Sequence, residues 1–151
     1  MANDAFVPLR AEDFTDVRVP RRLLNYADLV DAITHRLAKN YVAETKGLNA
    51  TGLGRYMRLR GRFDVRLRVS ATAWWSHGIT PLWCEYDCAE GVAHFLRSKF
   101  DDVQVDGSGK STIVRFPVRL KAGVERDDVI DSAVEQMVRI ADALKDLPVT
   151  G

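Results

Sequence analysis

Residues 57–75 alternate apolar and polar side chains more regularly than any other stretch of the chain. Odd positions are apolar, and five even positions are arginines, namely Arg58, Arg60, Arg62, Arg66 and Arg68. Because side chains on a strand point alternately to opposite faces, this pattern predicts one buried face and one face lined with arginine. A single straight strand of this length would span roughly 60 Å, so we expect it to bend or break at Gly61.

Two segments show the three- and four-residue spacing of amphipathic helices. The first, over about 21–44, follows Pro20, which suits the first turn of a helix. Its expected core face is Leu29, Val30, Ile33, Leu37 and Tyr41. The second, over about 125–146, contributes Met137 and Ile140, and a short helix is expected over about 89–99.

Further strands are predicted over 79–86, 103–105 and 112–120, the last two joined as a hairpin, with Pro117 at or near a sheet edge. Runs of strands with helices segregated around them indicate an α+β fold with a mainly antiparallel sheet. It has a long N-terminal, a short middle and a long C-terminal helix. We expect one domain over 20–151, with Val65, Leu67 and Ile33 in its core, after an extended arm over 1–19.

Composition excludes some broad classes of protein but does not identify a function. The net charge of +1 gives no overall attraction to nucleic acid or to a membrane surface. No apolar run approaches the roughly 20 residues of a membrane-spanning helix, and the N-terminus lacks the order of a signal peptide. Two cysteines are too few for a disulfide scaffold. These features predict a cytoplasmic protein that is not bound to a membrane.

The segment Asp106–Thr112, DGSGKST, ends like a phosphate-binding loop. The full pattern requires a glycine at the position of Gln104, and a helix after the loop where this chain has an expected strand. We therefore favour a plain hairpin turn over a nucleotide site.

The sequence also contains residue types that can bind metals or act in catalysis, but their spacing does not match known sites. His77, Cys84, Cys88 and His94 have spacings that match no standard zinc motif. The triplet Glu44–Lys46 has the E-x-K spelling of restriction-type nucleases, but we expect it to end a helix. No serine or cysteine has a convincing base beside it. We expect no catalytic residue, no metal and no cofactor, and we predict a protein that is not an enzyme.

The arginine-lined face is the strongest candidate for binding. Arginine and tryptophan are enriched at protein interfaces, and both also bind nucleic acids. The alternative is a solvated face whose arginines pair with acids such as Glu85. The predicted partner-binding residues are Arg58, Arg60, Arg62, Arg66, Arg68, Trp74 and Trp83.

Two segments, Trp74–Trp83 (WWSHGITPLW, read as W-x-x-H-G-I-T-P-L-W) and Pro117–Asp131 (PVRLKAGVERDDVID), resemble C-terminal portions of uncharacterised bacterial proteins. Some of these proteins also carry restriction-endonuclease-like domains. Separately, the element order is similar to that of type III secretion chaperones and YbjN-like proteins. That resemblance implies a fold that dimerises and binds other proteins.

These observations predict a non-enzymatic protein-binding or regulatory module, chaperone-like or adaptor-like. The alternative is a nucleic-acid-binding domain associated with a nuclease or defence system. A twofold homodimer is expected, formed through the outer sheet face or the edge near Pro117, because Trp74 and Trp83 would otherwise leave aromatic surface in water.

Overall fold

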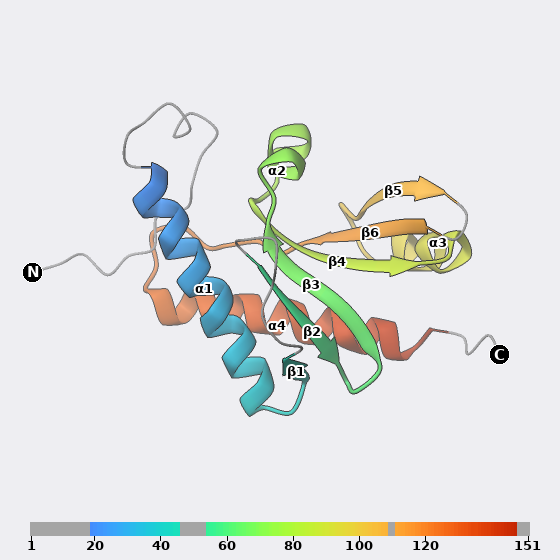
Figure 1. Ribbon diagram of the computed structural model, residues 1–151, viewed down its shortest axis with the longest axis horizontal. Helices are drawn as coiled ribbons and strands as arrows, with labels where there is room; N and C mark the ends of the chain where they lie inside the picture. The colour runs from blue at the N-terminus through green and yellow to red at the C-terminus, as the bar shows by residue number, and fades with distance from the viewer. Residues whose placement is uncertain (1–18, 46–53, 109–110, 148–151) are drawn as a thin grey trace, which may run out of the picture.

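The computed structural model describes residues 19–45, 54–108 and 111–147. Ten elements follow one another along the chain (Figure 1). The helices are α1 (Val19–Lys39), α2 (Ala71–His77), α3 (Glu90–Lys99) and α4 (Arg126–Lys145). The strands are β1 (Ala43–Thr45), β2 (Gly54–Leu59), β3 (Phe63–Val69), β4 (Leu82–Cys88), β5 (Gln104–Ser108) and β6 (Ser111–Pro117).

The strands form one six-stranded sheet in the order β1-β2-β3-β4-β6-β5, and every neighbouring pair is antiparallel. This confirms the predicted α+β class. Strand β6 lies between β4 and β5, so Pro117 is one strand in from the edge formed by β5. The predicted arm over 1–19 lies outside the described residues, except for Val19, where α1 begins.

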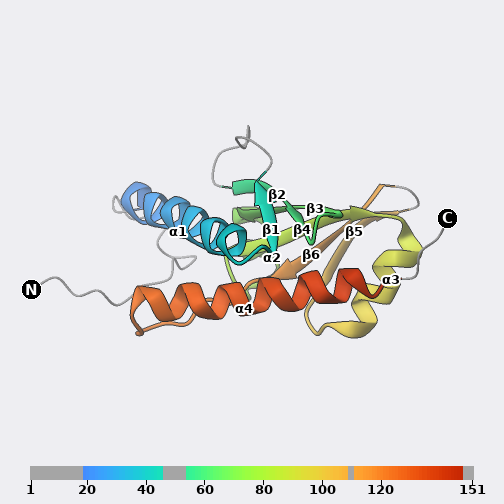
Figure 2. The ribbon, with the colours of Figure 1, turned by 90° about the horizontal axis from the view of Figure 1, so that it is seen from below.

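The core lies between the sheet and the helices α1, α3 and α4, and Figure 2 shows α4 running beneath the sheet. Each of the five expected core residues, Ile33, Val65, Leu67, Met137 and Ile140, is at most 2% exposed. The inward side chains of β2 and β3 are the odd-numbered ones, from Met57 to Leu67. The alternation in the sequence therefore assigned the two faces of these strands correctly.

Strands β2 and β3 meet in a tight hairpin at the predicted break. Arg60 and Gly61 both have positive φ, 52° and 70°, and the Arg62 amide donates to the Leu59 carbonyl. Positive φ at both central residues is the signature of a type I′ turn, whose twist matches that of the flanking strands. Glycine supplies the left-handed conformation at little cost.

The strand prediction is wrong beyond Val69, because residues 71–77 form α2. Ser70 caps this helix by accepting a hydrogen bond at Oγ from the Ala73 amide over 3.2 Å. The helix ends at Gly78, which has φ 67°. Alanine at positions 71 and 73 continues the alternation of the strand, but alanine is also the best helix former. The cap and the terminal glycine therefore decide the local structure.

The first helix ends five residues earlier than predicted, at Lys39 instead of about 44. Tyr41 has φ 60°, and the Val42 amide donates to the Leu37 carbonyl, which closes the helix end. Tyr41 was expected on the core face, yet it is 91% exposed. Because the chain reverses there, Glu44 lies in strand β1 and not at a helix end. The expectation that the triplet Glu44–Lys46 ends a helix is therefore wrong. Lys46 lies outside the described residues.

The hairpin interpretation of DGSGKST is confirmed by the pairing of Ser108 with Ser111 in strands β5 and β6. Gly107 has φ 86°, and a Cβ atom there would lie 2.3 Å from the Ser111 carbonyl oxygen. A strand, and not a helix, follows the loop, so the helix N-terminus of a phosphate-binding loop is missing. Among the described helices, none is long and apolar enough to cross a membrane.

Candidate functional site: an arginine cluster on the outer sheet face

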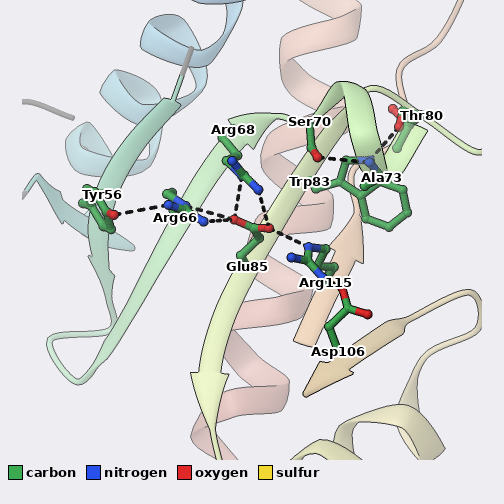
Figure 3. Close-up of polar contacts among 10 residues, drawn as sticks. All are labelled: Tyr56, Arg66, Arg68, Ser70, Ala73, Thr80, Trp83, Glu85, Asp106 and Arg115. Carbon is green, nitrogen blue, oxygen red and sulfur yellow. Dashed lines mark hydrogen bonds and ion pairs between the residues drawn. The ribbon is translucent and has the colours of Figure 1, made fainter. Parts of the chain in front are cut away.

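Glu85 lies at the centre of the sheet face that points away from the core, surrounded by three arginines (Figure 3). Arg66 donates to Oε1 from Nε over 2.9 Å and from Nη2 over 2.5 Å. Arg68 donates from Nη2 to Oε2 over 3.1 Å, and Arg115 donates from Nε to Oε2 over 2.7 Å. We call Arg66, Arg68 and Arg115 around Glu85 the arginine cluster.

The sheet register builds this cluster. Arg66 lies opposite Glu85 across β3 and β4, and Glu85 lies opposite Arg115 across β4 and β6. Arg68 is two residues along β3 from Arg66, so it points to the same face. One acid on a central strand therefore meets arginines from both of its neighbours.

Burial and charge act against each other at Glu85, whose side chain is 3% exposed. Burial alone would raise the pKa of the carboxyl group, but hydrogen bonds from the three arginines outweigh it, and the pKa of Glu85 is lowered. Glu85 is therefore a fixed anion. A buried carboxylate held this way cannot serve as a proton donor near neutral pH.

Arg68 is the least well held member of the cluster. Its Nε lies 2.7 Å from Glu85 Oε1 but lacks the direction of a hydrogen bond. Within the described parts of the chain, it is the one buried side-chain nitrogen or oxygen without a hydrogen-bond partner. Its side chain is also the most exposed of the three arginines.

The other predicted arginines lie apart from the cluster. Arg58 is on the outer face of β2 and pairs with Asp64, which raises the pKa of Arg58. Arg60 lies in the hairpin turn and pairs with Asp142 of α4 over 2.8 Å. Arg62, in the same turn, lies over the ring of Phe63. The arginines expected on one arginine-lined face thus lie in three places: on β2, in the β2–β3 turn and in the arginine cluster.

Trp83 has the outward position that its parity with Glu85 predicts, but it is fully buried. Helix α2 covers it, with the His77 ring 5.9 Å away, and its Nε1 donates to the Thr80 carbonyl over 2.7 Å. Trp74 belongs to α2 and packs against the core. The expected exposed cluster of Trp74 and Trp83 is therefore wrong; the large exposed aromatic of this helix is Trp75.

Four residues of the site were absent from the predicted set: Tyr56, Glu85, Asp106 and Arg115. Tyr56 accepts a hydrogen bond from Arg66 Nη1 over 3.3 Å, and Asp106 accepts one from Arg115 Nη1. A sequence signal did exist for Glu85, because it is an acid between the apolar run Leu82–Cys84 and Tyr86. On the sequence alone, its pairing with the arginines is the alternative to a binding face. The structure confirms that pairing for Arg66 and Arg68.

The four residues considered for zinc do not form a metal site. Cys84 is buried on the core face, Cys88 is half-buried, and both thiols are free. His94 lies on α3 within 4.0 Å of Glu90. Among the residues that the structure describes, no group of three or more His, Cys, Asp or Glu side chains could hold a metal ion.

A cavity of about 860 Å³ lies on the helix side of the sheet, between α4 and the segments that follow α3 and β6. Its rim carries acids and bases, among them the ion pair of Arg119 with Asp102. The Gln136 amide bonds both the N–H and the carbonyl of Arg119, each over 2.7 Å. None of the predicted binding residues lines this cavity. The candidate binding site is therefore the arginine cluster on the outer sheet face.

Compared with protein-family models, with curated proteins and with solved structures, the chain gives no significant match.

Proposed function

We propose that the protein is a non-enzymatic protein-binding or regulatory module, of the chaperone or adaptor kind, that uses its outer sheet face. The observation that carries the proposal is the pairing of the arginines with carboxylates of the same chain. Arg58, Arg66 and Arg68 each have an acidic partner, as does Arg115. A face that carries both charges, with arginine and tyrosine at its surface, has the composition of a protein interface.

The nucleic-acid alternative depends on arginines that are available to phosphate. Each phosphate contact needs a cation whose charge is not already neutralised. Among the residues that the structure describes, the outer face holds four arginines, Arg58, Arg66, Arg68 and Arg115, against five acids, Glu44, Asp64, Glu85, Asp87 and Asp106. This balance favours a protein partner over a polyanion.

A direct binding comparison tests the proposal. We expect members of a diverse labelled peptide panel to bind the protein with dissociation constants that change little with salt. Single-stranded DNA and RNA should not bind even at low ionic strength. Tight nucleic-acid binding that weakens steeply as salt is added, with no peptide bound, would favour the alternative.

The proposal includes a twofold homodimer and a cytoplasmic location. The dimer was expected because Trp74 and Trp83 would expose aromatic surface, but Trp83 is buried, so this argument no longer holds. What supports it now is Trp75, 74% exposed, together with strand β5, which pairs on one side only within the described sheet. The cytoplasmic location rests on two thiols that are both free, as expected in a reducing compartment.

A further inference from the structure

The charges of the outer sheet face are sorted into neighbouring rows that run across the strands. One row, which we call the arginine row, has residues opposite one another in register: Tyr56, Arg66, Glu85, Arg115 and Gln104. The acidic row lies two residues away from it on β2, β3, β4, β6 and β5 and extends onto β1. It consists of Glu44, Arg58, Asp64, Asp87, Ile113 and Asp106. The face is therefore electrically divided and not uniformly mixed.

The arginine row, together with Arg68, has more positive charge than its own acid can balance. Three guanidinium groups share the single carboxylate of Glu85, and Arg115 also bonds Asp106. Each guanidinium has five N–H donors in a fixed plane, so donors remain after these bonds are made. The side chains of Arg66 and Arg68 are 21% and 28% exposed. They are thus reachable by an incoming acceptor and held in place before it arrives.

The acidic row has the opposite imbalance, with four acids and one arginine. Arg58 is bonded to Asp64, and Asp106 is bonded to Arg115. Asp87 is exposed at the end of β4, and no partner holds it within the described structure. A cation placed beside Asp87 would meet an uncompensated carboxylate.

We propose that the outer sheet face binds an extended peptide segment in which an acidic and a basic residue stand two positions apart. The acidic side chain bonds Arg68 and its neighbours in the cluster, and the basic side chain bonds Asp87. Although Arg68 lies opposite Trp83, its guanidinium reaches the Glu85 carboxylate, so the cluster is centred on Glu85. Asp87 is two residues further along β4 and shares that face, which gives the two-position spacing. An extended peptide that runs along β4 repeats that spacing at roughly 3.3 Å per residue. This inference rests on the proposed protein-binding function and names the chemistry of the partner.

The same two rows disfavour the simpler partners. A polyanion attracted to the arginine cluster would place its next charges against Asp64, Asp87 and Asp106, where like charges repel. A polycation attracted to the acidic row would meet Arg66 and Arg68 in the same way. A segment with an acidic and a basic residue two positions apart can pair with the arginine row and with the acidic row at the same time.

The experiment uses fluorescence anisotropy with the whole chain and four labelled, blocked peptides of about nine residues, enough to run the length of β4. The first carries glutamate and lysine two positions apart in a background of alanine and threonine. The second has the same composition with the two charges adjacent, so that they point to opposite faces of an extended peptide. The third carries two glutamates two positions apart, and the fourth two lysines. We expect the first to bind about tenfold more tightly than each of the others.

Substitutions on the protein assign the contacts. Arg68→Gln and Asp87→Asn should each weaken the first peptide by about tenfold. Arg97→Gln on α3 and Glu135→Gln on α4 change the charge equally at exposed positions away from the face and should have no effect. Asp87→Lys should reverse the preference, so that the peptide with two glutamates becomes the tightest of the four. Circular dichroism and urea unfolding confirm that each variant is folded.

Two outcomes would overturn the inference. The first is equal binding of the composition-matched peptide with adjacent charges, which would show that spacing does not matter. The second is the absence of binding by all four peptides while other members of the diverse panel do bind. In that case the protein-binding function stands and the assigned chemistry is wrong. If no peptide of either set binds, both proposals fail.

Discussion

Glu85 and Arg115 face each other across strands β4 and β6, and Arg115 Nε donates to Glu85 Oε2 over 2.7 Å. Arg115 donates from its Nη1 to Asp106 of β5, so one guanidinium joins three strands. With Arg66 and Arg68 on β3, Glu85 connects both halves of the sheet. The stability of the sheet and the charge of its outer face therefore depend on the same carboxylate.

Glu85→Ala should lower the free energy of unfolding by about 3–5 kcal/mol, because it leaves three guanidinium groups without their buried acceptor. Urea unfolding followed by circular dichroism measures this effect without adding salt. Glu135→Ala, at an exposed site on α4, should change stability by no more than about 0.5 kcal/mol. Equal effects of the two substitutions would show that the cluster contributes nothing to stability.

Stability should fall with acidity through Glu85 in a defined direction. The pKa of Glu85 is lowered in the folded protein, so below about 4.3, the ordinary glutamate pKa, the unfolded chain takes up the proton first. The contribution of Glu85 is therefore fully present above that pH and is lost as pH falls through the folded pKa. Urea unfolding from about pH 7 to pH 3 should show the difference between wild type and Glu85→Gln shrinking at the acid end. A difference that is constant with pH would contradict the lowered pKa.

The two tryptophans around α2 should respond in opposite ways. Trp83→Ala removes a fully buried ring and should cost about 3–5 kcal/mol of unfolding free energy. Trp75→Ala removes a ring that is 74% exposed and should change stability by about 0.5 kcal/mol or less. Thermal or urea unfolding of both variants checks this pair. A large loss from Trp75→Ala alone would mean that α2 does not lie over Trp83.

The thiols should react in a fixed order. Burial raises the pKa of Cys88 to about 11, and it raises the pKa of the fully buried Cys84 further. Since the thiolate is the reactive form, Cys88 should react with an aromatic disulfide reagent at about pH 8 over a hundredfold more slowly than a free cysteine. Cys84 should react only when urea unfolds the chain. Comparison with Cys88→Ser assigns the slow phase, and a fast reaction of Cys84 would show that the core face of β4 opens readily.

Light scattering at micromolar concentration tests the dimer. We expect twice the mass of one chain, and Trp75→Ala should shift the equilibrium toward the monomer. Arg97→Gln, remote from that helix, is the matched control. A monomer mass for the whole chain, unchanged when residues 1–19 are removed, would rule the dimer out.

The sequence predicted the faces of β2 and β3 because burial on one face imposes a strict period of two, visible from Met57 to Leu67. Helix α2 could not be recognised by period alone, since its alanines continue that period. It depends on one hydroxyl cap at Ser70 and on a glycine at its end. The end of α1 was missed because Tyr41 adopts a left-handed conformation more typical of glycine or asparagine.

The arginine cluster was only partly predictable for a different reason. Pairing of Glu85 with the arginines of β3 is predictable from the sequence, because β3 and β4 follow one another along the chain and pair antiparallel. The contact with Arg115 depends on β6 lying beside β4, which links segments about 30 residues apart along the chain. Periodicity within one segment contains no information about which distant strand becomes its neighbour.

Alignment errors during folding would be costly at Glu85. If β4 slipped by one residue against its neighbours, Glu85 would turn into the apolar core and Cys84 would turn outward, since successive side chains point to opposite faces. In the slipped chain the Glu85 carboxylate would be buried without a partner. The guanidinium groups on β3 and β6 would lose their acceptor. A one-residue slip would therefore cost free energy on both sides of β4, so the cluster favours the native register of the sheet.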